Sequence, residues 1–147
     1  MYSKEEVREL KKEFWTTFSQ EYPRKWLLYN TKIKDFSFKF YIDNKRIEVL
    51  LAIENKDPEL RKIYFQKIES LKTILEEEFL DDVIFDEYFI LDNNKEISKI
   101  WVEKDRISFH NKNNWGEIFA FFNEKMDAFE RFFYEYEDYI KDLETNV

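Results

Sequence analysis

Residues 115–136 read WGEIFAFFNEKMDAFERFFYEY, and ten aromatic residues lie between Trp115 and Tyr139. Apolar side chains recur there at intervals of three and four, the spacing that places them along one face of a helix. The members of this stripe are Phe119, Phe122, Met126, Phe129, Phe133, Tyr136 and Ile140. Because large aromatic side chains bury more apolar area than aliphatic ones, we expect this helix to organise the core.

The same helix is a candidate interface. It is predicted to begin near Asn113 or Asn114 and to end near Leu143, a length of about 45 Å. A compact domain of this size is about 38 Å across, so the helix should bend or project at one end. Aromatic residues off the stripe, together with Trp26, Tyr29 and Trp101, exceed what one modest core can bury, which favours a dimer or partner interface. The interface candidates are Phe121, Phe132, Tyr134, Tyr139 and Trp101.

The composition indicates one globular domain over residues 1–147. Of these residues 44% are hydrophobic, 38% charged and 20% aromatic, whereas disordered segments lack aromatic residues. Cysteine is absent, which excludes disulfides, a thiolate nucleophile and cysteine-based metal sites. No segment matches a signal peptide or approaches about 18 uninterrupted apolar residues, so we expect a cytoplasmic protein that does not insert into a membrane. A net charge of −8 opposes general nucleic-acid binding.

Residues 36–53 predict a β-hairpin. Phe36, Phe38, Phe40 and Ile42 alternate with polar or amphipathic residues, and residues 47–53 repeat that alternation. A two-residue turn at 44–45 pairs residues whose numbers sum to 89. Every apolar residue of one strand then faces an apolar residue of the other, so the register agrees with the burial pattern.

The remaining elements follow from caps and periodicity. Ser3 and Glu6 form a capping box for a first helix that ends before Pro23. Asp57 and Pro58 open a second helix, whose apolar stripe runs to residue 79. Residues 83–91, 96–103 and 106–110 predict three more strands, the first with apolar residues on both faces, as in a central strand or one with a bulge. A turn at 104–105 joins the last two.

The predicted fold class is therefore α+β. An antiparallel sheet of about five strands is covered by three helices, in the order α-β-β-α-β-β-β-α.

One group of residues suggests metal chemistry. Asp35 is expected opposite Glu54, and Glu54 and Lys56 form an E-x-K pair, as in nucleases of the PD-(D/E)xK type. Such enzymes hold Mg²⁺ with carboxylates and use the lysine to position or polarise the attacking water. The pair lies at the end of a strand, however, and E-x-K recurs by chance in a chain rich in both residues. Two solvated carboxylates with a nearby lysine are the alternative interpretation.

Other polar residues give weaker signals. His110 is the only histidine, Ser108 has no glycine-rich elbow, and the sole glycine, Gly116, excludes a phosphate-binding loop. The acidic residues 76–78, 81–82 and 86–87 lack EF-hand spacing and are interpreted as a helix surface and a turn. Arg24 and Lys25 form a local basic patch, with Trp26 available for base stacking.

Several phrases resemble a known family. FWTTF, KDFSFKFYIDNKRIEVLLAIENKDPELR, SLKTILEEEF and NKNNWGEIFAFFNEKMDAFERFFYEY are similar to a bacterial family catalogued as domain of unknown function 4268. The resemblance spans nearly the whole chain, and its most specific part is Trp115 to Tyr136. Members occur alone or attached to restriction-endonuclease-like domains. The resemblance implies a context of nucleic-acid processing or defence, and it carries over no catalytic residue.

The leading functional prediction is a non-catalytic module for protein interaction or self-association, as a homo-oligomer or with a protein partner, and without a cofactor. The alternative is a metal-dependent nuclease using Asp35, Glu54 and Lys56 with Mg²⁺. A third interpretation is a nucleic-acid-binding accessory domain that uses Arg24, Lys25 and Trp26.

Overall fold

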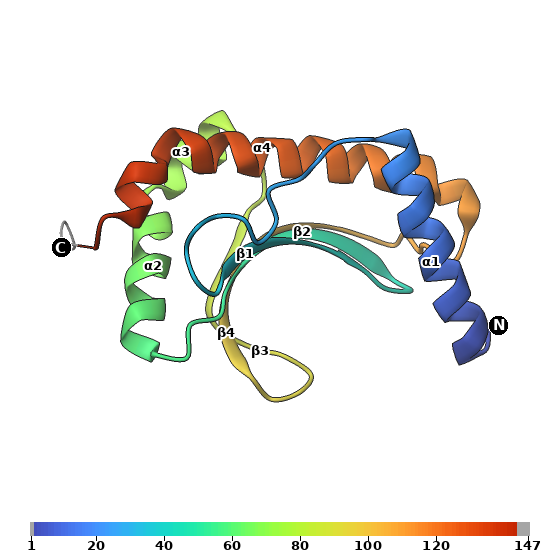
Figure 1. Cartoon of the computed structure of the whole chain (residues 1–147), viewed down its shortest axis with the longest axis horizontal. Coiled ribbons are helices and arrows are strands. Elements are labelled where there is room, and N and C mark those ends of the chain that lie inside the picture. The colour runs from blue at the N-terminus through green and yellow to red at the C-terminus, as the bar shows by residue number, and fades with distance from the viewer. Residues whose placement is uncertain (1, 144–147) are drawn as a thin grey trace.

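Four antiparallel strands form one curved sheet in the computed structural model, which describes residues 2–143. The strands are β1 (Phe36–Ile42), β2 (Arg46–Ile53), β3 (Ile84–Ile90) and β4 (Glu96–Asp105), in the spatial order β1-β2-β4-β3. The helices are α1 (Lys4–Glu21), α2 (Pro58–Ser70), α3 (Lys72–Glu78) and α4 (Trp115–Lys141), with a 3₁₀ turn η1 (Lys112–Asn114) before α4. All four contribute to the hydrophobic core on one face of the sheet, and the opposite face carries no helix (Figure 1). The α+β class is confirmed.

The predicted hairpin forms in the predicted register. Phe36 pairs with Ile53, Phe38 with Leu51, and the remaining pairs keep the same sum up to the turn. Alternate residues of both strands, starting at Phe36, are turned toward the helices and into the core. The match shows that cross-strand apolar pairing and a short turn are sufficient to specify this register.

The predicted fifth strand, residues 106–110, is wrong. Strand β4 does not turn at 104–105 but continues to Asp105, and it pairs along the whole of β2, from Ile53 opposite Ser98 to Arg46 opposite Asp105. Strand β2 has apolar residues on both faces and can therefore hydrogen-bond to a second strand besides β1. Pairing with β2 gives β4 a longer ladder than a local hairpin with residues 106–110 would. Residues 106–110 form a loop that still buries Ile107 and Phe109 in the core.

The predicted single helix over residues 58–79 is also wrong, because the chain breaks at Leu71 between α2 and α3. Leu71 has ψ 10°, and the Ser70 hydroxyl donates a hydrogen bond of 2.6 Å to the Lys67 carbonyl at the end of α2. Ile68 and Leu75 are buried on either side of the break. The apolar stripe thus predicted which side chains are buried, but it did not predict the break in the helix at Leu71.

Strand β3 contains the predicted bulge but lies at an edge and not at the centre of the sheet. Its register against β4 shifts between Asp86 and Phe89. At the opposite edge, the Phe38 N–H of β1 donates 3.0 Å to the Leu28 carbonyl of the preceding loop. A bulge and a covering loop are devices that limit edge-to-edge association of sheets.

Helix α4 crosses the sheet and contributes ten of the thirty buried residues of the main core cluster, more than any other element. Of the predicted stripe, all members are buried except Tyr136, which is half-buried. Tyr136 also has non-helical backbone angles (φ −110°, ψ 15°), so the helix bends near its C-terminal end, one of the two outcomes expected from its length. Within residues 2–143, no helix combines the length and the apolarity needed to cross a membrane.

Candidate functional site

The loop between α1 and β1 has an unusual local charge. Residues 22–34 contain four basic residues and no acidic one, although the whole chain has a net charge of −8. Trp26 and Tyr29 lie in the same segment. Aromatic residues and arginine are enriched in protein interfaces, so the position of this loop in the fold is informative.

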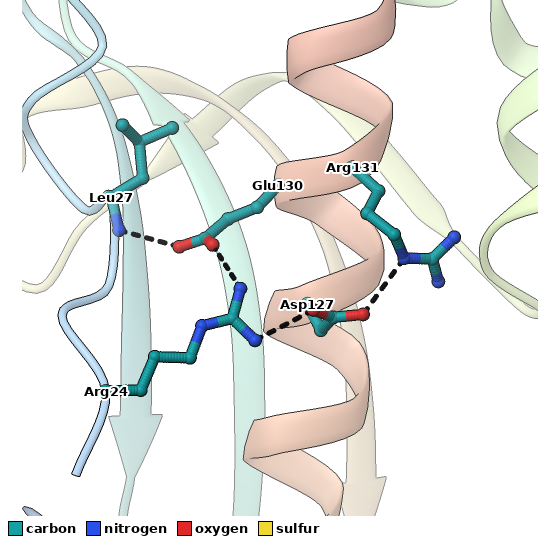
Figure 2. A network of polar contacts seen from close by, with 5 residues as sticks. All are labelled: Arg24, Leu27, Asp127, Glu130 and Arg131. Atoms are coloured by element: carbon teal, nitrogen blue, oxygen red, sulfur yellow. Dashed lines mark hydrogen bonds and ion pairs between the residues drawn. The ribbon is translucent and has the colours of Figure 1, made fainter. Parts of the chain in front are cut away.

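A network of polar contacts fastens the loop to α4 (Figure 2). The Arg24 guanidinium donates to Asp127 at 2.8 Å and to Glu130 at 2.6 Å, and the Leu27 N–H donates to Glu130 at 2.6 Å. Arg131 donates to the second Asp127 oxygen at 2.9 Å. Partial burial would lower the pKa of Arg24, but the hydrogen bonds to Asp127 and Glu130 raise it. The loop is therefore held by one buried carboxylate, Glu130, whose side chain is 5% exposed.

Replacing Glu130 by glutamine is expected to lower the free energy of unfolding by about 1.5–3 kcal/mol, the range for hydrogen bonds to charged groups. Glutamine keeps the shape but loses the charge that Arg24 pairs with. Urea denaturation followed by circular dichroism measures the change. Glu135→Gln, at an exposed position of the same helix, is the matched control and should alter stability by less than about 0.5 kcal/mol. Equal effects of the two substitutions would contradict the anchoring role of Glu130.

Further contacts fix the rest of the loop. The Thr31 hydroxyl donates to the Phe36 carbonyl at 2.7 Å, and the Asn55 side chain donates to the Lys34 carbonyl at 3.1 Å. Left-handed backbone conformations occur at Leu28, Lys32 and Asp35, with φ between 48° and 63°. Such conformations persist in non-glycine residues where the surroundings hold them in place. The loop is thus a fixed surface against α4 and β1.

Between this loop and α4 lies a groove of about 500 Å³, lined by Lys25, Trp26, Leu27, Tyr29, Asn30, Lys32 and Tyr134. We call it the Tyr29–Tyr134 groove. Tyr29 is 76% exposed and Tyr134 is 57% exposed, and the Arg24 guanidinium lies 4.2 Å from the Trp26 ring. The lining includes two lysines, three aromatic residues and no carboxylate. The groove is therefore an exposed aromatic surface with a positive local charge.

The five interface candidates occupy different environments. Phe132 and Trp101 are buried by the chain itself, and Phe121 is half-buried on α4. Tyr139 is partly exposed, but its hydroxyl hydrogen-bonds with Ser70 at 2.8 Å. Only Tyr134 lines the groove. Sequence reasoning missed Lys32 as a member of this surface, because periodicity gives no information on how a loop folds back.

Asp35 and Glu54 are adjacent in the backbone, as the hairpin register predicts, since the Glu54 N–H donates 2.7 Å to the Asp35 carbonyl. The Glu54 carboxylate, however, accepts hydrogen bonds from Lys39 at 2.9 Å and Lys95 at 3.1 Å. Burial would raise the pKa of Glu54, but these two lysines lower it. Lys56 is exposed and forms no ion pair with either carboxylate among the contacts of residues 2–143.

These contacts do not fit Mg²⁺. Both Glu54 oxygens are occupied by ammonium groups, and in the described part of the chain no three acidic, histidine or cysteine side chains are grouped to hold a metal ion. The nuclease alternative stays a prediction without support from the donor set.

Sequence reasoning also missed a buried ion pair on the helix-free face of the sheet. Glu48 of β2 is 1% exposed, and its carboxylate lies 2.7 Å from the Lys99 ammonium and 2.9 Å from Arg46 Nε. In an alternating strand pattern, both positions resemble ordinary solvated residues. The only signal in the sequence is the alternation along each strand: Glu48 shares a face of β2 with Leu50, and Lys99 shares a face of β4 with Ile97.

The fold and the groove define an α+β domain with a fixed, basic and aromatic surface loop beside its longest helix. The chain belongs to the family described as Domain of unknown function (DUF4268), whose profile matches residues 10–137. The match includes the loop, the sheet and most of α4. No curated protein and no solved structure matches the chain.

Proposed function

We propose that this domain is a non-catalytic protein-interaction module and that its Tyr29–Tyr134 groove binds an acidic segment of a partner protein. The observation that carries the proposal is the groove lining, which combines two lysines and three aromatic residues without a carboxylate. A few residues carry most of the binding energy of a protein interface, and tyrosine and tryptophan are enriched among them. A positive groove on a chain of net charge −8 selects for local negative charge in the partner.

The small number of cations available in the groove favours a protein partner over a nucleic acid. Arg24, the first residue of the predicted basic patch, is already neutralised by Asp127 and Glu130. Lys25 and Lys32 form no ion pair among the described residues. Two cations displace few counterions from a phosphate backbone, whereas nucleic-acid binders make several phosphate contacts. A short acidic peptide requires no more charges than the groove provides.

The architecture of the loop supports the same function. Because Glu130 and Asp127 hold Arg24 and the Leu27 backbone in place, little conformational entropy remains to be lost in the loop on binding. Preorganised surfaces bind more tightly for the same contact area. The contacts of Figure 2 would therefore contribute to affinity without touching the partner.

The test uses a fluorescein-labelled peptide of Glu-Glu-Phe repeats, with fluorescence anisotropy as the readout. Removing both groove charges in Lys25→Gln/Lys32→Gln is expected to weaken binding about tenfold, since each interfacial charge pair contributes on the order of 0.7 kcal/mol. Tyr134→Ala should weaken it by a similar factor. The double variant Lys4→Gln/Lys12→Gln removes two exposed lysines from α1 and serves as the matched control.

Three results would contradict the proposal. In the first, the control variant weakens binding as much as the groove variant, which indicates non-specific attraction. In the second, a thymidine 20-mer binds through Lys25 and Lys32 while the peptide does not, which indicates a nucleic-acid site. In the third, light scattering shows that unlabelled protein forms dimers that Tyr134→Ala disrupts, which makes a second copy the occupant.

A further inference from the structure

The face of the sheet that carries no helix has an apolar cluster of its own. Antiparallel sheets with one free face usually carry polar residues there. On this face, however, apolar side chains of β2 and β4 are buried together: Leu50, Ala52, Ile97 and Trp101. Phe89 and Leu91 of the β3–β4 hairpin pack against them, and the hairpin closes one side of this face (Figure 1).

A pocket of about 240 Å³ lies between this cluster, strand β1 and the β3–β4 hairpin. Its apolar walls are formed by Leu50, Ala52, Phe89, Ile90, Leu91 and Ile97. An apolar cavity of about 150 Å³ in another protein stays dry and binds benzene, whereas sites for drug-sized ligands occupy roughly 300–1,000 Å³. The volume of this pocket therefore suits a molecule with one aromatic ring.

The charged residues that line the pocket balance one another. Three are cations and three are carboxylates: Lys39, Arg46 and Lys99, and Glu48, Glu54 and Asp92. Lys39 donates to Glu54 at 2.9 Å. Glu48 lies 2.7 Å from the Lys99 ammonium and 2.9 Å from Arg46 Nε. A charged ligand would have to displace one of these ions from its partner or lie in the pocket without one, and an uncompensated buried charge is costly.

The polar atoms that lack a directed hydrogen bond are not exposed to the pocket. Both Glu48 carboxylate oxygens and Arg46 Nε are in ion-pair contact without hydrogen-bond geometry, and all three atoms are shielded from solvent. The Lys99 side chain is 7% exposed, and its ammonium lies 4.2 Å from the Phe89 ring centroid. The accessible surface of the pocket is therefore mainly carbon, and its occupant needs no hydrogen-bonding group.

Two further polar groups of the lining add no site for a charged ligand. The Tyr41 hydroxyl donates to Asp43 at 2.8 Å. Burial and this hydrogen bond raise the pKa of Tyr41 to about 12, so the phenol is uncharged near neutral pH. The Asp92 side chain is exposed and is solvated by bulk water.

We propose that this pocket binds a small neutral molecule made of one aromatic ring with a small apolar substituent. The ring would lie on Leu50, Ala52 and Ile97. Removal of apolar surface from water would drive binding, and the surrounding ion pairs would stay as they are. A charged analogue would lose its hydration without gaining a partner. The site is separate from the Tyr29–Tyr134 groove and does not depend on the function proposed for it.

Toluene, benzoate and benzylammonium are the probes, because they share one ring and differ in charge. Nuclear magnetic resonance of the backbone amides is the readout. We expect toluene to shift the Leu50, Ala52 and Ile97 resonances with a dissociation constant on the order of 1 mM. Benzoate and benzylammonium should each bind at least about tenfold more weakly, because neither charge finds a free partner in the pocket.

Two substitutions test the location of the site. Ala52→Leu puts a larger side chain into the pocket and should abolish the toluene shifts, whereas Ala120→Leu, at an exposed position of α4, should leave them unchanged. Leu91→Ala removes part of an apolar wall at a half-buried position and should weaken toluene binding about threefold. Its matched control is Leu143→Ala, at a position that is 40% exposed and outside the pocket.

The proposal is overturned if toluene produces no shifts up to its solubility limit or if either charged analogue binds as tightly as toluene. It is equally overturned if the shifts lie away from the pocket, or if Ala52→Leu binds toluene as the natural chain does. Where thermal unfolding shows that Ala52→Leu is unstable, the leucine pair decides. Equal toluene binding by Leu91→Ala and Leu143→Ala then overturns the proposal.

Discussion

Replacing Phe122 by alanine is expected to lower the free energy of unfolding by about 3–5 kcal/mol, the range for truncating a fully buried phenylalanine. The ring is completely buried on α4. Its ring centroid lies 4.7 Å from that of Phe40 of β1 and 6.0 Å from that of Trp15 of α1, on which the ring stacks. The ring also makes edge contacts with Phe14 and Phe18 of α1. The side chain thus joins two helices and the sheet, and the cavity left by alanine would lie where they meet.

Chemical denaturation with a linear extrapolation to water measures this loss. Tyr134→Ala removes a comparable ring from the same helix, but at a position that is 57% exposed, and it should cost less than about 1 kcal/mol. A Phe122→Ala variant no less stable than Tyr134→Ala would show that α4 does not organise the core as described.

The second large effect is expected from Lys99→Met, which should lower the free energy of unfolding by about 3 kcal/mol. Methionine keeps the length and apolar shape of the side chain but removes the cation closest to Glu48. That carboxylate is 1% exposed, so it cannot turn to water for compensation. Arg46 remains 2.9 Å away and limits the loss to the lower end of the range for broken buried ion pairs.

The double variant Glu48→Met/Lys99→Met separates this cause from lost packing. Removing both charges takes Glu48 away from Arg46 as well, but the Arg46 side chain is 40% exposed and can be solvated. Replacing a buried pair by apolar residues is often neutral or stabilising. We therefore expect the double variant to regain most of the lost stability. If the double variant is as unstable as Lys99→Met, or less stable, the loss arises from packing against Phe89 and Trp101. It then does not arise from the Glu48 charge that Lys99→Met leaves without its closest cation.

The hairpin shows what local pattern can predict. Phe36–Ile42 and Arg46–Ile53 pair in the expected register because a one-residue slip would move every apolar side chain to the opposite face. The capping box predicted at Ser3 and Glu6 is likewise present. Both features depend on residues close together in the chain, so the sequence contains all the information they need.

The strand order shows where local pattern fails. Residues 96–103 and 106–110 satisfy the rules for a hairpin, yet β4 pairs with β2, which is distant in sequence. Whether a strand pairs with a local or a distant strand depends on how many residues can pair and on how well the resulting sheet covers the core. Neither quantity can be read from one segment of the sequence. The break at Leu71 has the same origin, because an unbroken helical stripe over 58–79 does not show where α2 must turn.

The sites divide in the same way. Basic residues, aromatic residues and the absence of acids in 22–34 are visible in the sequence, and they mark the loop as a surface of interest. Their partner on α4 is not visible. In the sequence, Glu130 is one more charged position among residues 115–136. Only folding brings its carboxylate within 2.6 Å of the Arg24 guanidinium, 106 residues earlier. The buried contact between Glu48 and Lys99 likewise joins two strands, β2 and β4, that are distant in sequence.

The sequence of this protein determined most of its helices and strands, its hairpin register and the apolar stripes that enter the core, because these follow from periodic burial of apolar side chains along short segments. The tertiary structure alone decided the strand order, the bend of α4 at Tyr136, the fastening of the loop by Glu130 and the buried Glu48–Lys99 pair. These depend on contacts between distant segments, where the cost of burying a charge is offset only by a partner that folding supplies.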